Sequence, residues 1–378
     1  MKKISILSLH LGYGGIEKSI VSLANMLCNN YEVEIACSYM LYDNPAFSID
    51  SRVKIKYLVG DKKPNREEFF KSLKHFNYFQ AIKEGIYGLE TLYLRKKTMI
   101  KYITDGDYDI IISSRDIFNE LVSKYASDKV LKIGWEHNHY HGDLKYADKI
   151  VSSVRNFDYL VLVSKELEKF YNSRMKLAKC KCIYIPNVIE DIPDDTSDLK
   201  AKKMISVGRL SLEKGFMDLL KIFKEIAKED SEWTLEIIGD GDERGRLEKY
   251  ICDNGLSDRV SLSGFKDKEY IYDALKKSSI YLMTSYTESF GIVLLEAMSC
   301  GVPCVAFSSA EGATEIIEDG KNGYLIDNRN FYKYIDKVKL LMDNFDVRVK
   351  LGKEAYYGVG KYSSDTVATD WLNLLEKM

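Results

Sequence analysis

The fold is decided by Ser279-Ile-Tyr-Leu-Met-Thr-Ser-Tyr-Thr-Glu-Ser-Phe-Gly-Ile-Val-Leu-Leu-Glu296, in which one apolar run leads through a glycine into another. Residues 279–285 predict a buried strand. Gly291 allows a tight turn where the next helix begins. The backbone N–H groups of Phe290, Gly291 and Ile292 would then stand at a helix N-terminus, where unpaired donors and the helix dipole favour a phosphate.

Two glutamates, Glu288 and Glu296, flank this turn. A carboxylate can accept two hydroxyl hydrogen bonds, as a sugar or a ribose diol would offer. Taken alone, the pair could equally be an ordinary loop acid and a solvated helix residue. Other loops of the chain decide between these interpretations.

Two similar strand-to-helix loops lie upstream. The first carries Gly208, Arg209 and Lys214 before a helix predicted over 216–228, and its two cations could clamp a pyrophosphate or simply be solvated. The second, Gly239-Asp-Gly241, is a glycine-rich turn where backbone could approach a base or a phosphate. All three loops would lie at the carboxyl ends of neighbouring parallel strands, where open α/β sheets bind ligands.

Together these motifs resemble the retaining glycosyltransferases of family 4, which have the GT-B fold. The resemblance is close in the C-terminal half and looser in the N-terminal half. The residues that carry it are Gly208-Arg209, Lys214-Gly215, Gly239-Asp-Gly241, the Glu288 to Glu296 pair with its Phe-Gly, and Gly312-Ala-Thr-Glu-Ile-Ile-Glu-Asp-Gly-Lys-Asn-Gly323.

The family implies two Rossmann-like, doubly wound parallel-sheet domains that face each other across a cleft. We expect an acceptor-binding domain over 1–190 and a nucleotide-sugar domain over 199–360, with a terminal helix over 364–378 crossing back to the first. The acidic, proline-containing segment 190–198 reads as the linker. Alternating strands and helices fit this α/β architecture; the predicted strands are 4–10, 33–39, 53–59, 108–113, 131–136, 159–164, 182–185, 203–208, 233–239, 260–263, 279–284, 302–307 and 323–326.

The resemblance also implies the chemistry. A hexose would pass with retention of configuration from a nucleoside-diphosphate sugar to a hydroxyl of a lipid-linked or cell-surface glycan. The expected donor is UDP-glucose, UDP-galactose or UDP-N-acetylgalactosamine. Arg209, Lys214 and the helix start would stabilise the leaving diphosphate, so no metal and no cofactor beyond the co-substrate is expected. Glu288 would orient the donor sugar and Glu296 the ribose. The alternatives are a GDP-mannose donor, a GT-B-fold epimerase and a non-catalytic sugar-nucleotide-binding module.

The loop after the first strand carries Gly14 and Gly15 at the start of a helix predicted over 16–29. A dinucleotide-binding fingerprint would place its third glycine at Glu17, and no acid follows the second strand, so NAD is not expected. In the family, this glycine pair lets the backbone approach the donor phosphate or the acceptor.

The segment Trp135-Glu-His137-Asn-His139-Tyr-His141 follows the fifth predicted strand. In an extended chain its histidines would share one side and could bind a metal, but no fourth ligand is apparent. The family carries a functional histidine near here, which assigns His137 to the transferred sugar; His139 or His141 could touch the acceptor.

Charge is distributed unevenly although the net value is −2. Residues 54–101 hold twelve cations against five acids, and Phe79, Ile82, Ile86, Leu89 and Tyr93 recur at helical spacing. This segment could contact an anionic membrane, or its apolar stripe could pack on the first sheet. The pI of about 6.3 argues against nucleic acid.

Seven cysteines, an odd number without zinc-site spacing, argue against both a disulfide framework and a zinc site. No apolar stretch reaches the roughly 18 residues of a spanning helix. We therefore expect a cytoplasmic protein, peripheral at the inner face of the membrane if the basic segment binds lipid.

Overall fold

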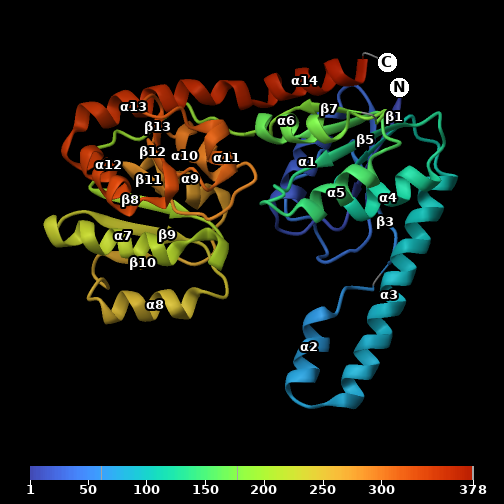
Figure 1. Ribbon diagram of the computed structural model, residues 1–378, viewed down its shortest axis with the longest axis horizontal. Helices are drawn as coiled ribbons and strands as arrows, with labels where there is room; N and C mark the ends of the chain where they lie inside the picture. Colours follow the sequence, from blue (N-terminus) through green and yellow to red (C-terminus); the bar gives the residue numbers. More distant parts are fainter. Residues whose placement is uncertain (61, 177, 377–378) are drawn as a thin grey trace. The chain divides into compact units, whose positions relative to one another are not determined.

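The computed structural model describes residues 1–60, 62–176 and 178–376 and divides into two compact units (Figure 1). Unit 1 comprises residues 1–185 together with 370–378, and unit 2 comprises residues 186–369. The division falls shortly before the acidic segment 190–198. Asp61 in the predicted basic segment and the last two residues of the predicted terminal helix lie outside the described residues.

Unit 1 is built on a parallel seven-stranded sheet in the order β3-β2-β1-β4-β5-β6-β7. Its central strands are almost wholly buried, as expected where helices cover both faces of a parallel sheet. The strands are β1 (Lys3–Ser8), β2 (Glu32–Cys37), β3 (Lys54–Tyr57), β4 (Ile110–Ser113), β5 (Leu131–Glu136), β6 (Tyr159–Leu162) and β7 (Lys181–Tyr184). The helices that alternate with them are α1 (Gly15–Leu27), α4 (Asp116–Tyr125), α5 (Leu144–Ser153) and α6 (Lys165–Arg174).

Unit 2 is built on a parallel six-stranded sheet in the order β10-β9-β8-β11-β12-β13. Helix α7 illustrates how the core of unit 2 forms. Its apolar residues are spaced three and four apart, so Leu219, Phe223 and Ile226 lie on one face and are buried in the core. The strands are β8 (Lys203–Val207), β9 (Thr234–Ile238), β10 (Val260–Leu262), β11 (Ile280–Met283), β12 (Cys304–Phe307) and β13 (Gly323–Ile326). The helices are α7 (Phe216–Glu229), α8 (Arg244–Asp253), α9 (Lys268–Lys276), α10 (Ile292–Ser299), α11 (Glu311–Ile316), α12 (Phe331–Asp343) and α13 (Phe345–Gly358).

These two sheets confirm the predicted doubly wound architecture, and each predicted strand segment overlaps an observed strand. In both sheets the strand order reverses beside the first strand, between β1 and β4 and between β8 and β11. The last helix, α14 (Ser364–Glu376), contributes Trp371 to unit 1, where its ring lies 5.2 Å from that of Trp135. Among the described residues, no helix is long and apolar enough to cross a membrane.

Two further helices of unit 1 form an arm: α2 (Arg66–Lys74) and α3 (Tyr78–Asp105). In Figure 1 the arm extends away from the sheet of this unit. The stripe on α3 does not pack on the sheet, because Phe79 is 81% exposed and Leu89 is 70% exposed. The packing interpretation of this stripe is therefore wrong.

Candidate functional site

The candidate site of unit 2 lies where β8, β9 and β11 end. These strands are neighbours in the sheet and run parallel, so the loops that follow them meet at one edge. The predicted residues on these loops come from segments up to about 90 residues apart in the sequence. The parallel sheet is what brings them together.

Lys214 and Glu288, predicted from two separate motifs, form an ion pair between the loops after β8 and β11. The side chains are 23% and 18% exposed, so the pair is partly shielded from water but reachable. Arg209 is 73% exposed and pairs with Glu213 at 3.2 Å. Both cations therefore stand at the strand ends, and a bound anion could replace the glutamate that each one now contacts.

The loop that carries Lys214 is held against β11. The Thr284 hydroxyl donates to the carbonyl of Gly215 at 2.9 Å, at the point where the short helix Leu212–Lys214 passes into α7. This hydrogen bond holds the loop with Lys214 in place at the end of the sheet. Its position is therefore set by the fold rather than by a ligand.

The glycines of the loop after β9 approach neighbouring backbone. A Cβ on Gly239 would lie 1.9 Å from the carbonyl oxygen of Gly208, and one on Gly241 would lie 2.5 Å from that of Leu210. The Gly208 N–H donates to Ile238 at 2.9 Å. Contact between these two loops accounts for both glycines without a ligand, and it positions the Arg209 loop.

Helix α10 begins at Gly291, whose φ of 90° lies in the left-handed region that favours glycine. Over the described parts of the chain, the backbone N–H groups of Phe290, Gly291 and Ile292 donate to no protein acceptor. Phe290 itself is buried, and its ring lies 5.7 Å from that of Tyr362. These donors thus stand at a helix start as predicted, and anion binding there stays a prediction.

Glu296 lies on α10, one turn beyond its start, and is only 7% exposed. The interpretation of Glu296 as a solvated helix residue is therefore wrong. Burial, followed by the charge of Glu296, raises the pKa of the neighbouring Tyr272. A buried carboxylate beside the helix start is a suitable acceptor for hydroxyl groups.

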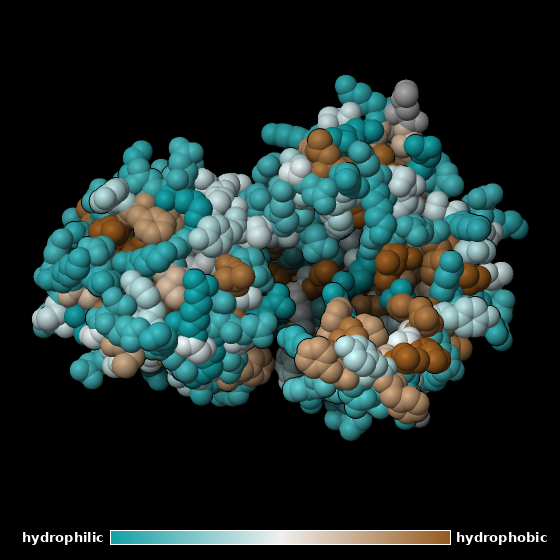
Figure 2. All heavy atoms as spheres, turned by 60° about the horizontal axis from the view of Figure 1, so that its bottom comes forward, coloured by the Kyte–Doolittle hydropathy of each residue, from teal (hydrophilic) through white to brown (hydrophobic). Residues whose placement is uncertain are grey.

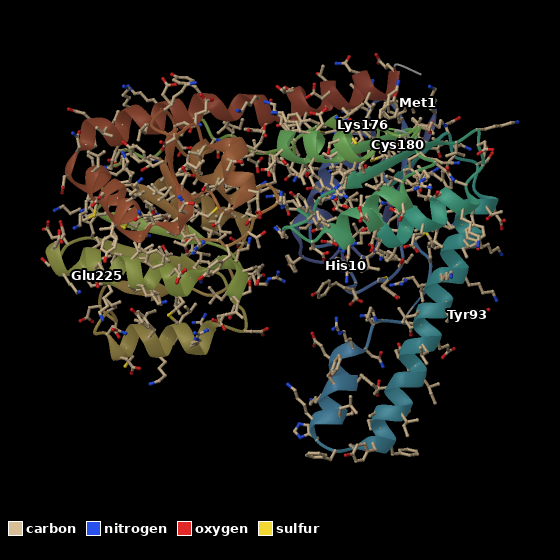
Figure 3. All side chains as sticks on the ribbon, in the orientation of Figure 1. Met1, His10, Tyr93, Lys176, Cys180 and Glu225 are labelled. Atoms are coloured by element: carbon tan, nitrogen blue, oxygen red, sulfur yellow. The ribbon has the colours of Figure 1, made fainter. Side chains whose placement is uncertain are left out.

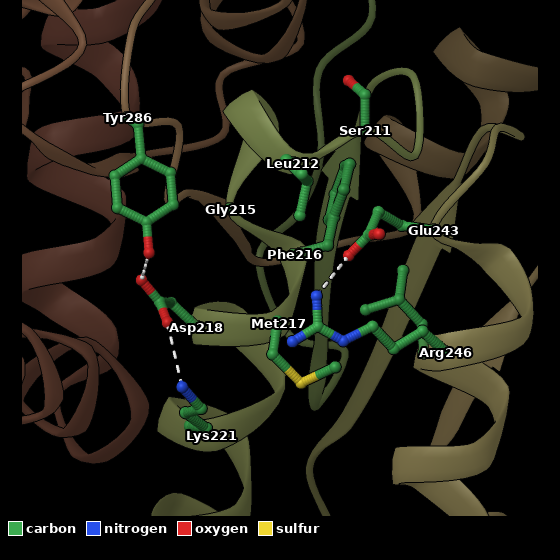
Figure 4. A pocket seen from close by; sticks show the side chains of 11 residues that line it. Ser211, Leu212, Gly215, Phe216, Met217, Asp218, Lys221, Glu243, Arg246 and Tyr286 are labelled. Carbon is green, nitrogen blue, oxygen red and sulfur yellow. Dashed lines mark hydrogen bonds and ion pairs between the residues drawn. The ribbon is translucent and has the colours of Figure 1, made fainter.

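A network that the sequence did not reveal braces the loop after β11. Arg329 donates to Asp218 at 2.8 Å and to the Ser285 carbonyl at 3.0 Å, and its guanidinium lies 3.8 Å from the Tyr286 ring centre. Burial opposes ionisation of Asp218, but hydrogen bonds from Tyr286 and Arg329 lower its pKa overall. Figure 4 shows the Tyr286–Asp218 part of this network beside a cavity of about 180 Å³ that Lys221 and Arg246 also line.

No local signal could have revealed this network, because Arg329 and Asp218 are 111 residues apart in the sequence. Its effect is to hold the segment that leads from Thr284 toward Glu288, since Arg329 also donates to the Thr284 carbonyl at 3.0 Å. Arg329 is therefore a positioning residue for this edge of the site.

In unit 1 the predicted glycine pair stands at the start of α1. A Cβ on Gly14 would lie 2.1 Å from a carboxylate oxygen of Glu17, whereas nothing lies within 4 Å of one on Gly15. Glu17 is buried and accepts from Arg115 at 2.8 Å. His10, labelled in Figure 3, lies 3.7 Å from the same carboxylate; burial lowers its pKa although Glu17 opposes the shift.

The close approach of the Glu17 carboxylate thus explains why position 14 is a glycine. In the sequence, Glu17 stands out only because a dinucleotide-binding fingerprint would have its third glycine there. Gly15 leaves open space at a helix start, which suits the approach of a ligand. The ion pair between buried Glu17 and partly exposed Arg115 joins the segments that follow β1 and β4, where this sheet reverses its strand order.

His137 follows β5 and is 6% exposed, with its ring 4.2 Å from that of Trp135. Burial lowers the pKa of His137 to about 3, so the imidazole is neutral at pH 7. Its Nε2 is buried and has no partner in the part of the chain that the structure describes. A buried imidazole nitrogen without a partner can accept or donate one hydrogen bond to a ligand that reaches it.

Glu136, the residue before it, is buried and accepts hydrogen bonds from the Asn138 N–H at 2.7 Å and the Tyr146 hydroxyl at 3.1 Å. Burial raises its pKa to about 7. The sequence did not single out this carboxyl group, although it stands at a strand end next to His137.

The three histidines do not share one side of an extended chain. The strand ends at Glu136, and His141 has a φ of 48°, which turns the segment. His139 is buried, its Nδ1 accepts from the His141 N–H at 3.0 Å, and its Nε2 lies 3.8 Å from Glu166. The prediction that His137, His139 and His141 lie on one side of an extended chain is therefore wrong. That the reaction needs no metal stays a prediction.

Comparison with known proteins finds a family that matches most of unit 2. The family described as "Glycosyl transferases group 1" matches residues 188–357, which lie within unit 2 and contain every predicted site residue of that unit. The chain is 24% identical over 374 residues to an exopolysaccharide phosphotransferase of Streptomyces coelicolor, covering 97% of this chain and 39% of that protein.

Two other proteins match over nearly their full length. An amylovoran biosynthesis glycosyltransferase of Erwinia amylovora is 24% identical over 377 residues, covering 96% of each chain. The structure of HepE from Anabaena in complex with UDP superposes with a TM-score of 0.74 at 17% identity and covers all of both chains. The solved structures with this two-sheet fold also include a lipopolysaccharide outer core galactosyltransferase.

Proposed function

We propose that the protein transfers a hexose from a nucleoside-diphosphate sugar to a glycan, since residues 188–357 match the group 1 glycosyl transferases and the chain has the GT-B fold. The acceptor in this proposal is a hydroxyl of a lipid-linked or cell-surface glycan. The names of the exopolysaccharide and amylovoran relatives support a polysaccharide setting.

One observation carries the proposal: the Lys214–Glu288 pair and the start of α10 lie at the edge of one sheet. Lys214 and the backbone N–H groups at Gly291 provide positive charge where a diphosphate would leave. Arg209 adds a planar fork that suits phosphate oxygens. Preorganised donors of this kind stabilise developing negative charge most when they need no rearrangement.

The reaction balances without a protein nucleophile. The bond from the anomeric carbon to the diphosphate oxygen breaks, and its electrons stay on the leaving phosphate. The acceptor oxygen bonds to the same carbon from the same face, and its proton passes to a leaving-phosphate oxygen. Retention follows because attack and departure share a face.

Within this scheme Glu288 orients donor hydroxyls and Glu296 the ribose, and His137 contacts the transferred sugar. Once Lys214 pairs with the diphosphate, the Glu288 carboxylate is able to accept a hydrogen bond from a donor-sugar hydroxyl instead. The burial of Glu296 and the unpaired Nε2 of His137 support these roles.

The donor we propose is a UDP-sugar, and the reaction needs no metal. The loop Ala310-Glu-Gly-Ala-Thr-Glu315 supports a glucosyl, galactosyl or N-acetylgalactosaminyl donor over GDP-mannose, and UDP in the HepE complex agrees with it. The cations of residues 54–101 support electrostatic attraction of unit 1 to an anionic membrane.

Nucleotide release with water as the acceptor tests the proposal. Each of UDP-glucose, UDP-galactose, UDP-N-acetylgalactosamine and GDP-mannose is incubated with the protein and a chelator, and free nucleotide and recovered sugar nucleotide are measured. We expect UDP release from one UDP-sugar and an α-configured free sugar in the first NMR spectra. Epimerised sugar nucleotide without free UDP would identify an epimerase. Nucleotide binding without release, with water and with a broad panel of acceptor glycans, would identify a non-catalytic module.

A further inference from the structure

Helix α3 presents one unbroken series of side chains at coiled-coil spacing. Steps of three and four residues alternate along Phe79, Ile82, Ile86, Leu89, Tyr93 and Lys96. This is the a and d pattern of a heptad repeat, the arrangement by which one helix packs against another. The five apolar members are between 63% and 81% exposed. We call these six residues the α3 seam.

The seam faces away from α2, the helix beside α3. On the opposite side of α3, Ala81 is buried, a Cβ on Gly85 would meet the Phe69 ring at 3.4 Å, and Glu84 accepts from Asn65 at 2.6 Å. Figure 2 shows tan and brown apolar residues gathered where the end of the arm faces the reader. Contiguous exposed apolar surface of this kind marks an interaction site.

We propose that the α3 seam pairs in antiparallel orientation with the α3 seam of a second copy of this chain, around a two-fold axis between Ile86 and Leu89. An antiparallel pair packs each a residue against a d residue. Ile86 then meets Leu89 of the second copy, and Ile82 meets its Tyr93. Phe79, at the outer end, comes opposite Lys96 of the second copy.

Charge complementarity favours this orientation. The heptad positions that flank the seam on one side are occupied by Lys83 and Glu90. The antiparallel register sets Lys83 of each copy against Glu90 of the other, so two opposite-charge pairs form. Glu90 is 56% exposed and accepts from Lys62 of its own chain at 2.6 Å, and its second oxygen remains available to another lysine.

A cavity at the base of α3 fits the same register. Its volume is about 380 Å³, and Tyr93 and Lys96 of the seam form part of its lining. The other lining residues include Leu92, Met99, Phe118 and Leu121. A cavity of roughly 150 Å³ already holds a benzene ring. The phenyl ring of Phe79 from each copy can therefore enter the cavity of the other, which makes the contact self-complementary.

The size of the contact is that of a modest dimer. Five large apolar side chains on each copy remove on the order of 1,000 Å² from water, near the lower limit for a specific interface. We therefore expect association that depends on concentration. This inference does not depend on the sugar donor or on the proposed reaction.

Sedimentation equilibrium of the full-length protein over a concentration series, without lipid, tests the pairing. We expect a monomer–dimer equilibrium that Ile86→Glu shifts to monomer. Phe79→Ala should weaken association on the order of 30-fold, as for the loss of an interface anchor. Tyr332→Glu, which alters a side chain 83% exposed on α12 of unit 2, is the matched control and should leave the dimer unchanged.

Cysteine cross-linking tests the orientation. Cys252 is the exposed cysteine among the described residues, so Cys252→Ser gives a suitable background. A mixture of Ile86→Cys and Leu89→Cys proteins should form a disulfide-linked heterodimer on mild oxidation. Either variant alone should cross-link less. Preferential linking of Ile86→Cys to itself would indicate parallel helices and overturn the register.

Vesicles of phosphatidylcholine with phosphatidylglycerol test the alternative that the α3 seam binds a membrane. A protein that is monomeric across the series would overturn the proposal. Vesicle binding by that monomer, lost in Ile86→Glu, would assign the seam to the membrane instead. A dimer that persists unchanged in Ile86→Glu would also overturn it, because another surface would then hold the two copies together.

Discussion

The strand ends of the two sheets treat charge in opposite ways. In unit 1 the Glu17 side chain is 5% exposed and Glu136 is buried. In unit 2 the paired carboxylates are more open to water, because Glu288 is 18% exposed and Glu213 is 41% exposed. A carboxylate shielded from water loses more when its cation leaves than a more exposed one does, so the cations of unit 2 can turn to an incoming phosphate at lower cost. We therefore expect anion binding in unit 2 and a rigid edge in unit 1.

The largest expected effect on stability comes from removing Arg115, the cation that pairs with the buried Glu17 of unit 1. Arg115→Met leaves Glu17 buried without its guanidinium partner and should lower the free energy of unfolding by about 3–5 kcal/mol. Urea denaturation measures this loss. UDP affinity at low temperature should stay unchanged; a marked loss of UDP binding would mean that unit 1 also holds the nucleotide.

Glu136→Gln should change how stability depends on pH. Folded Glu136 keeps its proton to about pH 7, whereas an unfolded glutamate loses it near 4.5, so the folded state binds more protons between these values. Raising the pH through this window therefore removes stability from the wild type. The variant should gain up to about 3 kcal/mol relative to wild type between pH 4.5 and 7.

Chemical denaturation at several pH values checks this difference. The lowered pKa of His137 acts in both proteins, because both retain the histidine, and it cancels in the comparison. A pH-independent difference would show that Glu136 is not protonated in the folded protein.

Removing Glu296, the buried carboxylate of unit 2, should weaken nucleotide binding as well as stability. Glu296→Ala removes an acceptor for ribose hydroxyls, and each hydrogen bond to a charged group contributes about 1.5–3 kcal/mol. UDP affinity measured by calorimetry should fall roughly 10-fold to 100-fold. Glu225→Ala, on the exposed part of α7, is the control; equal UDP affinity in both variants would refute the ribose contact.

Tyr286→Phe should have the smallest effect. It removes the hydroxyl that donates to Asp218 at 2.7 Å but leaves Arg329 bonded to the same carboxylate. We expect a loss of about 1 kcal/mol in stability, because the brace survives. A loss as large as that of Arg115→Met would mean that the Arg329 network depends on this hydroxyl.

The fold and half of the site could be predicted because their signals are local. Apolar runs and glycine turns define the strands and helix starts, and Lys214 and Glu288 each lie in a recognisable loop. Arg329 and Arg115 could not be predicted, because their partners Asp218 and Glu17 are 111 and 98 residues away. The seam on α3 was visible as spacing, but only the structure shows that no sheet covers it.

Turnover by Lys214→Ala tests the central claim most directly. UDP release from the preferred donor should fall about 10²–10³-fold in kcat while the melting temperature stays near that of wild type. Lys228→Ala, which removes the same charge from an exposed pair on α7, should release UDP at the wild-type rate. Near-wild-type turnover by a folded Lys214→Ala protein would contradict the claim that the diphosphate leaves at this edge of unit 2.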